Sequence, residues 1–315
     1  MNDDFEPRTE RVRLAAAGAR SATKSALEGG GRGRHVLPNR IFQAILLLAV
    51  SIALLGLALI LIDAFIEGKG RLSLGLITDS NSSDAANAGF KQAIIGTIYL
   101  ISFVILLVVP LGVGAAVYLE EYANRERWYN RLIEVNIQNL AAVPSIVYGI
   151  LGLAFIIRGP LDLGFMLFAG SLTLTLLVLP TVIIATREAI RAVPPSIREG
   201  SLALGATQWQ TIRRQVLPAA IPGVLTGIIL AISRAIGEAA PLLLLGAATF
   251  VTFDPEPFNP DTGWTALPVQ IFQLAARPQE EIREVAAAGI ILMLAVLLLM
   301  NSFAIWLRNR YEQKW

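Results

Sequence analysis

The sequence contains no cysteine and a single histidine, His35. The lack of cysteine excludes disulfides, thiolate nucleophiles and cysteine-based metal sites. One histidine in a polar segment also argues against a histidine metal cluster or a catalytic triad. Charged residues make up 16% of the 315 residues, against about 25% in a soluble domain. Such a chain has too little polar surface to cover a soluble globule.

Lysine is scarce as well, with four in the whole chain, and no GxxxxGK[ST] phosphate loop is present. A chain without this loop lacks the usual nucleotide-binding motif. We therefore expect a protein without enzyme activity, cofactor or metal of its own; if ATP drives it, ATP and Mg²⁺ bind to a partner subunit. Internal repeats are not apparent, which weighs against secondary-transporter folds built from inverted repeats.

Long apolar runs, by contrast, are abundant. The chain is 55% hydrophobic with a mean hydropathy of +0.61, and six stretches approach the roughly 20 residues that a bilayer requires. They are Ile41–Ile66, Ile94–Leu119, Ile137–Ile157, Phe165–Thr186, Ile221–Ala247 and Val285–Leu307. We predict an all-α membrane protein with six transmembrane helices in contact with lipid. Pro110, Pro180 and Pro241 lie inside these spans and predict bent helices.

The distribution of lysine and arginine predicts the topology, because these residues are enriched in cytoplasmic loops. With the N-terminus inside, the inner segments carry 19 of them and the outer segments 6. Both termini are therefore predicted to be cytoplasmic, and the long segment 248–283 to lie outside. Its aromatic side chains suit either an interfacial belt or a docking face for a partner. They are Phe253, Phe258, Trp264 and Phe272.

Residues 1–40 carry eight basic and five acidic residues and a glycine-rich stretch. This composition predicts a disordered, basic cytoplasmic tail, with a weak helix over 8–27 on anionic lipid as an alternative. The following apolar run is too long for a signal peptide. We assign 41–93 to the first transmembrane helix and an outer loop, and 94–315 to a transmembrane domain with an inner loop at 187–218.

The inner loop carries two helix-capping patterns. Ser196 and Glu199 match the S-x-x-E capping box, and Thr207 and Gln210 match the related T-x-x-Q box. Gly205 lies between them and suits the residue that follows a helix C-terminus. The loop is therefore predicted to form two short helices with a glycine joint.

The first of these helices is too apolar for a free loop. Its apolar residues are Ile197, Leu202, Ala203 and Leu204. An apolar helix of this kind packs in a groove. The residues alone leave two alternatives, a helix folded back onto its own bundle and a helix that contacts a partner.

The fifth span carries two charges, Arg234 and Glu238, which are four residues apart and can touch on one helix face. A charge at membrane depth costs on the order of 3 kcal/mol, so such residues usually face a bundle interior or an aqueous path. Arg234 is predicted about 20 Å from the inner boundary, at 1.5 Å per residue. The pair is either a structural lock or a solute contact, since a guanidinium fork suits an oxyanion. The adjacent Ser233 is a further candidate, although polar residues here often join helices.

The inner loop resembles the EAA loop of ABC importer permeases, EAA-x3-G-x9-I-x-L-P. The matching positions are Glu199, Gly200, Ser201, Gly205, Leu217 and Pro218. Gly200 and Ser201 replace the two alanines and preserve their small size, whereas Gln215 replaces the isoleucine and loses an apolar contact.

Three further segments are similar to the PstA-type permeases of bacterial phosphate ABC transporters, and the resemblance extends from about residue 94 to 307. The segments are Asn139–Gly149, Arg234–Pro241, and Ala266–Gln270 with Arg277–Glu280. This resemblance implies a type I ABC importer permease bundle of the MetI-like kind in the bacterial inner membrane. It also implies inorganic phosphate as the solute and half of the translocation path as the contribution of this chain.

In that family the loop is a coupling helix that lies in a cleft of the ATPase subunit. The implied coupling residues are Glu199, Gly200, Ser201, Leu202, Ala203 and Gly205. The residues assigned to the substrate path are Arg234, Glu238 and Ser233. The implied partners are a homologous C-type permease, two ATP-binding subunits and an extracytoplasmic phosphate-binding protein, with no nucleic acid. The alternatives are a permease for sulfate or molybdate and an ATP-independent channel or carrier.

Overall fold

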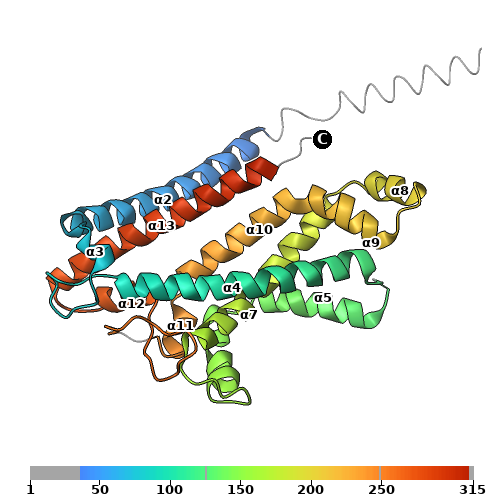
Figure 1. Cartoon of the computed structure of the whole chain (residues 1–315). Helices are drawn as coiled ribbons and strands as arrows, with labels where there is room; N and C mark the ends of the chain where they lie inside the picture. Colours follow the sequence, from blue (N-terminus) through green and yellow to red (C-terminus); the bar gives the residue numbers. More distant parts are fainter. Residues whose placement is uncertain (1–35, 125, 248–249, 312–315) are drawn as a thin grey trace, which may run out of the picture. The chain divides into compact units, whose positions relative to one another are not determined.

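The structure is a computed structural model that describes residues 36–124, 126–247 and 250–311. Residues 1–35 of the predicted tail lie outside the described residues. The chain divides into two compact units, Met1–Ile62 and Asp63–Trp315. The described part of the first unit is a single long helix that continues into the second, and the second unit contains every other described helix (Figure 1).

The described residues form helices and loops, with one isolated bridge between Ala247 and Trp264. The α-helices are α2 (Val36–Gly68), α3 (Gly75–Thr78), α4 (Lys91–Val117), α5 (Trp128–Ala141), α6 (Ser145–Leu151), α7 (Leu167–Arg191), α8 (Pro195–Ala203), α9 (Gln208–Thr211), α10 (Leu217–Gly237), α11 (Ala240–Leu244), α12 (Leu267–Ala275) and α13 (Glu280–Tyr311). The other helical turns are the 3₁₀-helix η1 (Lys69–Arg71) and the π-helices η2 (Tyr118–Tyr122), η3 (Gly152–Ile157) and η4 (Ile212–Val216). This confirms the all-α class.

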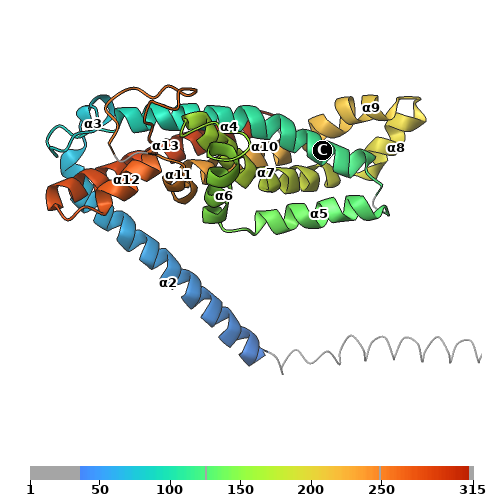
Figure 2. The ribbon, with the colours of Figure 1, turned by 90° about the horizontal axis from the view of Figure 1, so that it is seen from below.

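Five helical segments are long and apolar enough to cross a membrane, and a bent pair makes a sixth if it counts as one span. That pair replaces the predicted span Ile137–Ile157, which is not one straight helix. Helix α5 and the α6–η3 segment meet at 107° (Figure 2). Pro144 lies at the break, and proline disfavours helical backbone in the residue before it. The Tyr148 hydroxyl donates to the Leu140 carbonyl at 2.9 Å and so satisfies a carbonyl near the end of α5.

The fifth span also differs from the prediction of Ile221–Ala247. Its helix starts at Gln208, passes through η4 without a break and ends at Gly237. The span is therefore longer at the loop end and shorter at the other end. Glu238 has extended backbone (ψ 111°), and Pro241 lies in the first turn of the separate helix α11.

Helix α7 is the most deeply buried of the spans, and it packs between α4 and α10 (Figure 1). Small residues allow this close approach, as is common between membrane helices. A Cβ atom added to Gly112 of α4 would lie 2.7 Å from Val182 of α7, and one added to Gly223 of α10 would lie 2.7 Å from Ala189. Larger residues at these glycines would push the helices apart.

The loops gather at two ends of the second unit. At one end, the Gln270 side chain donates to the Gly89 carbonyl at 3.0 Å and Lys91 pairs with Asp254 at 3.4 Å. At the other end, segment 120–136 meets segment 187–217. We call these the outer and inner ends, following the predicted topology. This grouping of the loops agrees with spans that cross the membrane in alternating directions. Which of the two ends faces the cytoplasm stays a prediction.

The outer-end aromatics do not behave alike. Trp264 is fully buried, its indole Nε1 donates to the Phe165 carbonyl at 3.0 Å, and its ring fills the space beside Gly170. An interfacial or docking role for Trp264 was therefore a wrong prediction, because the ring is part of the core. Phe253, Phe258 and Phe272 are exposed, and for them both predicted roles stay open.

Candidate functional site

Helix α8 begins earlier than the capping pattern predicts. Its N-cap is Pro194, with no side-chain capping bond, and Pro195 is its first residue. Proline is well suited to the first helical position because that position needs no N–H partner. Ser196 then lies inside the helix, so the predicted Ser196–Glu199 capping box is wrong.

The joint after α8 matches the prediction. Gly205 has a φ of +84°, a conformation that favours glycine. The predicted capping box of the next helix is present, because the Thr207 hydroxyl accepts from the Gln210 backbone at 3.3 Å and the Gln210 side chain accepts from the Thr207 backbone at 2.9 Å. The second helix is not short, however: the sequence predicts its end at Leu217, before Pro218, whereas in the structure it continues into α10.

The residues of α8 have different surroundings. Ile197 packs partly buried against the core, and the Ser201 hydroxyl lies 2.9 Å from that of Thr211. Leu202 on the helix is 49% exposed, and Leu204, its C-cap residue, is 91% exposed. The exposed coupling candidates are Glu199, Gly200, Leu202, Ala203 and Gly205. Helix α8 therefore docks on its own bundle through Ile197 and Ser201 and leaves large apolar side chains exposed at its C-terminal end.

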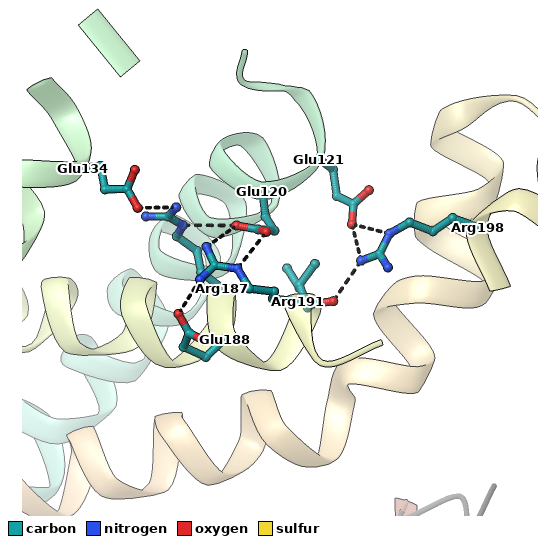
Figure 3. Close-up of polar contacts among 8 residues, drawn as sticks. Glu120, Glu121, Glu134, Arg187, Glu188, Arg191 and Arg198 are labelled. Atoms are coloured by element: carbon teal, nitrogen blue, oxygen red, sulfur yellow. Dashed lines mark hydrogen bonds and ion pairs between the residues drawn. The ribbon is translucent and has the colours of Figure 1, made fainter. Parts of the chain in front are cut away.

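Carboxylates and guanidinium groups converge at the inner end beside α8 (Figure 3). Glu120 and Glu121 lie on η2, the π-helical end of α4, and both side chains are buried. Arg191 of α7 donates to both oxygens of Glu120 at 3.2 Å. Arg187 of α7 donates to Glu134 of α5 at 2.8 Å. These bonds join α4, α5 and α7 at one level.

Arg198 extends this network to α8. Its Nε and Nη2 atoms donate to one oxygen of Glu121 at 3.1 and 2.8 Å. Its Nη1 donates to the Val193 carbonyl and its Nη2 to the Ile190 carbonyl, both at 2.8 Å. A cation beside the last carbonyls of α7 also complements the negative end of the helix dipole.

Sequence reasoning missed this network because it used the arginines only in the count of loop lysine and arginine and did not use the carboxylates. The available signal was the pair Glu120-Glu121 at the end of a predicted span, in a segment otherwise assigned to the inner side. Two adjacent acidic residues at a membrane boundary require basic partners if they are buried. The arginines of the next inner loop are the nearest candidates.

Arg234 and Glu238 do touch, with Nε and Oε1 3.3 Å apart. Glu238 lies one residue past the end of α10, so the pair bridges a helix terminus. The Arg234 side chain is 44% exposed and that of Glu238 18%. Within the described residues, Arg234 makes no other hydrogen bond, and its two Nη groups stay available.

Ser233 has a structural partner. Its hydroxyl lies 2.6 Å from Oδ1 of Asn301 on α13 and 2.8 Å from the Ile229 carbonyl. A hydroxyl that joins two membrane helices in this way stabilises their packing. The Ser233 hydroxyl therefore takes part in the contact between α10 and α13.

These features define an α-helical membrane protein with exposed apolar side chains beside a short helix at one end and a partly exposed ion pair at the end of one span. Residues 108–313 match the family model described as "Binding-protein-dependent transport system inner membrane component". The chain belongs to this family.

Two relatives illustrate the similarity. The chain is 35% identical over 239 residues to the "Probable ABC transporter permease protein YqgI" of Bacillus subtilis, with 75% of this chain and 80% of the relative covered. It is 34% identical over 269 residues to the "Phosphate transport system permease protein PstA" of Yersinia pestis, with 84% and 88% covered.

Solved structures share the fold. A chain of a bacterial alginate ABC transporter matches with a TM-score of 0.66 at 17% identity, covering 88% of this chain and 96% of that chain. A chain of the MetNI methionine ABC transporter matches with a TM-score of 0.54 at 18% identity, covering 70% and 94%. The predicted type I ABC importer permease fold is thereby confirmed.

Family membership also settles the general function. The chain is the inner-membrane permease component of a binding-protein-dependent ABC importer. It is a transport subunit and not an enzyme, because permeases of this family bind no cofactor and ATP hydrolysis takes place on separate ATPase subunits. This membership favours an ATP-driven importer over the alternative of an ATP-independent channel or carrier.

Proposed function

We propose that this chain is a permease subunit of an importer for inorganic phosphate. Several relatives that cover most of the chain are named phosphate transport system permeases. In the proposed complex the chain pairs with a homologous C-type permease and forms half of the path. Two ATP-binding subunits attach at the inner end, and a phosphate-binding protein delivers solute at the outer end.

The observation that supports this proposal most strongly is the exposure of the Arg234 side chain. A guanidinium with 44% of its side chain exposed, on a membrane helix, has a face that contacts water, solute or the second permease rather than its own bundle. Its planar fork donates parallel hydrogen bonds to an oxyanion such as phosphate. Glu238 holds one nitrogen and offsets part of the charge, which keeps anion binding weak enough for release.

The coupling role of the inner loop rests on α8. The residues proposed to act there are Glu199, Gly200, Ser201, Leu202, Ala203 and Gly205. A surface hollow of about 490 Å³ lies beside the helix, and Leu202 of α8 and Leu204 of its C-cap are exposed apolar side chains. Exposed apolar side chains at the end of a short helix suit the groove of a partner protein, and we assign this contact to the ATPase subunit.

Solute identity is tested with the assembled transporter in vesicles. Uptake of radiolabelled phosphate, sulfate and molybdate is measured with ATP inside the cytoplasmic compartment and the binding protein outside. We expect ATP-dependent uptake of phosphate alone. Uptake of sulfate or molybdate in place of phosphate would overturn the phosphate assignment and leave the permease role intact.

A further inference from the structure

Arg198 holds α8 against two other helices at once, although the residue lies within the coupling helix itself. It bonds the Glu121 carboxylate at the end of α4, the Ile190 carbonyl in the last turn of α7 and the Val193 carbonyl just after α7. These four hydrogen bonds use three nitrogens of one guanidinium. A flexible ammonium cannot reproduce this planar set of donors.

Both side chains of the Arg198–Glu121 pair are largely shielded from water. The Glu121 side chain is 9% exposed and that of Arg198 22%. The carbonyl of Glu121 also accepts a hydrogen bond from Gln208 of α9 at 2.6 Å. The end of α4 is thus fixed to the helices on both sides of the glycine joint, and a charge-assisted bond in such a site is stronger than one in open water.

A second attachment leads in another direction. Ser201, on the same helix as Arg198, lies with its hydroxyl 2.9 Å from that of Thr211, and Thr211 is buried. From Thr211 the helix continues without a break into α10. Side chains therefore connect α8 to α4 through Arg198 and to the helix of α9 and α10 through Ser201. The chain itself joins α8 to α7 on one side and to α9 on the other.

We propose that Arg198 is a positioning residue that transmits the displacement of α8 directly to the inner end of α4, so that α4 moves together with α7 and α10, to which the chain itself joins α8. The proposal rests on the coupling role of α8 given above. Without Arg198, α8 would keep its chain connections to α7 and α10 but would lose its direct bond to the carboxylate at the end of α4. The displacement of α8 would then reach α4 only indirectly, and less phosphate would be transported per ATP hydrolysed.

The test uses the complete transporter in vesicles, with this chain as wild type, Arg198→Lys or Glu121→Gln. Each variant keeps side-chain size but loses the fork or the charge of the carboxylate. Three quantities are measured: ATPase subunits retained on purification, ATP hydrolysis with phosphate-loaded binding protein, and phosphate transported per ATP. Arg213→Lys is the matched control, because Arg213 is exposed and has no ion pair within the described residues.

We expect Arg198→Lys and Glu121→Gln to keep the ATPase subunits and to hydrolyse ATP. Phosphate transported per ATP should fall roughly tenfold, which corresponds to about 1.4 kcal/mol. Unchanged transport per ATP in both variants would overturn the proposal. Loss of the ATPase subunits in both would overturn it too, because Arg198 would then only maintain the docking surface.

A double cysteine variant separates transmission from local folding. The chain has no cysteine, so Glu121→Cys/Arg198→Cys provides the only two thiols of this subunit. A short bifunctional thiol reagent should restore transport per ATP in this double variant, and failure to restore it in assembled complex would contradict the proposal. Leu204→Asp tests the underlying docking role separately: if it keeps the ATPase subunits and normal transport, α8 is not the docking helix.

Discussion

The guanidinium of Arg187 lies 2.8 Å from the carboxylate of Glu134, and this bond joins the central helix α7 to α5, the first half of the broken span. The Arg187 side chain is 8% exposed, and its Nε lies 3.5 Å from Glu120, which is 6% exposed. The inner end therefore contains buried charges whose stability depends on their partners.

Replacing Arg187 with methionine should destabilise the subunit. Breaking a buried ion pair costs about 3–5 kcal/mol because a charge is left without a partner. We expect the lower end of this range, since Arg191 still neutralises Glu120. Thermal unfolding in detergent measures the change. Arg131→Met is the control, because Arg131 is exposed on α5 and surface substitutions change stability by about 0.5 kcal/mol or less. Equal melting temperatures for the two variants would contradict the account.

Gly170 tests the packing of Trp264. A Cβ at Gly170 would lie 2.7 Å from the Trp264 ring, and overpacking a core costs about 1–3 kcal/mol. Gly114 on α4 has open space around it, so alanine there should be neutral or stabilising by up to about 1 kcal/mol through helix propensity. Gly170→Ala should therefore lower the melting temperature, whereas Gly114→Ala should leave it unchanged or raise it. An unchanged melting temperature for Gly170→Ala would show that the Trp264 ring is not held as described.

Gly205 tests the joint after α8. Its φ of +84° is strained for a β-branched residue and tolerated by asparagine. Gly205→Val should reduce ATPase attachment and phosphate uptake together, whereas Gly205→Asn should retain both. No span is altered, so membrane insertion should be normal in each variant, as checked by immunoblotting of the membrane fraction. Normal uptake by Gly205→Val would remove the joint from the coupling pathway.

The predicted topology is tested with single cysteines in this cysteine-free chain. Pro260→Cys lies in the exposed outer-end loop, and Ser25→Cys lies in the predicted cytoplasmic tail. An impermeant thiol reagent on intact cells should label position 260 and leave position 25 unlabelled until the membrane is permeabilised. The reverse pattern would show that the charge count assigns the wrong side.

The sequence predicts the helices well and their breaks poorly. Apolar runs identify the spans because the bilayer requires about 20 apolar residues. They do not show that the third span bends by 107°, since Pro144 and Pro110 look alike in a hydropathy pattern. Pro110 lies inside a continuous helix, whereas the break before Ser145 is held by the tertiary contact of Tyr148 with Leu140.

In the candidate site, too, the sequence predicts local contacts and misses contacts between distant residues. The Thr207–Gln210 capping box and the Arg234–Glu238 contact are local, and local spacing predicts them correctly. The bond between Arg198 and Glu121 joins residues 77 positions apart, and no local pattern identifies such partners. Trp264 was misjudged for the same reason, because only the folded chain brings it beside Gly170 and Phe165.

The central claim is that Arg234 contacts phosphate on its way through the path. The most direct measurement is phosphate uptake by vesicles containing matched amounts of assembled transporter with Arg234→Lys, Glu238→Gln or Arg234→Met/Glu238→Leu. A purely structural pair can be replaced by two apolar residues at little cost, because the desolvation penalty disappears with the charges.

The account predicts that the apolar double variant assembles but takes up no phosphate. Arg234→Lys should lose most uptake because it keeps the charge and loses the fork, and Glu238→Gln should be the least affected of the three because it keeps a hydrogen-bonding partner. Near-normal phosphate uptake by Arg234→Met/Glu238→Leu would contradict the claim and would make Arg234 and Glu238 a structural pair.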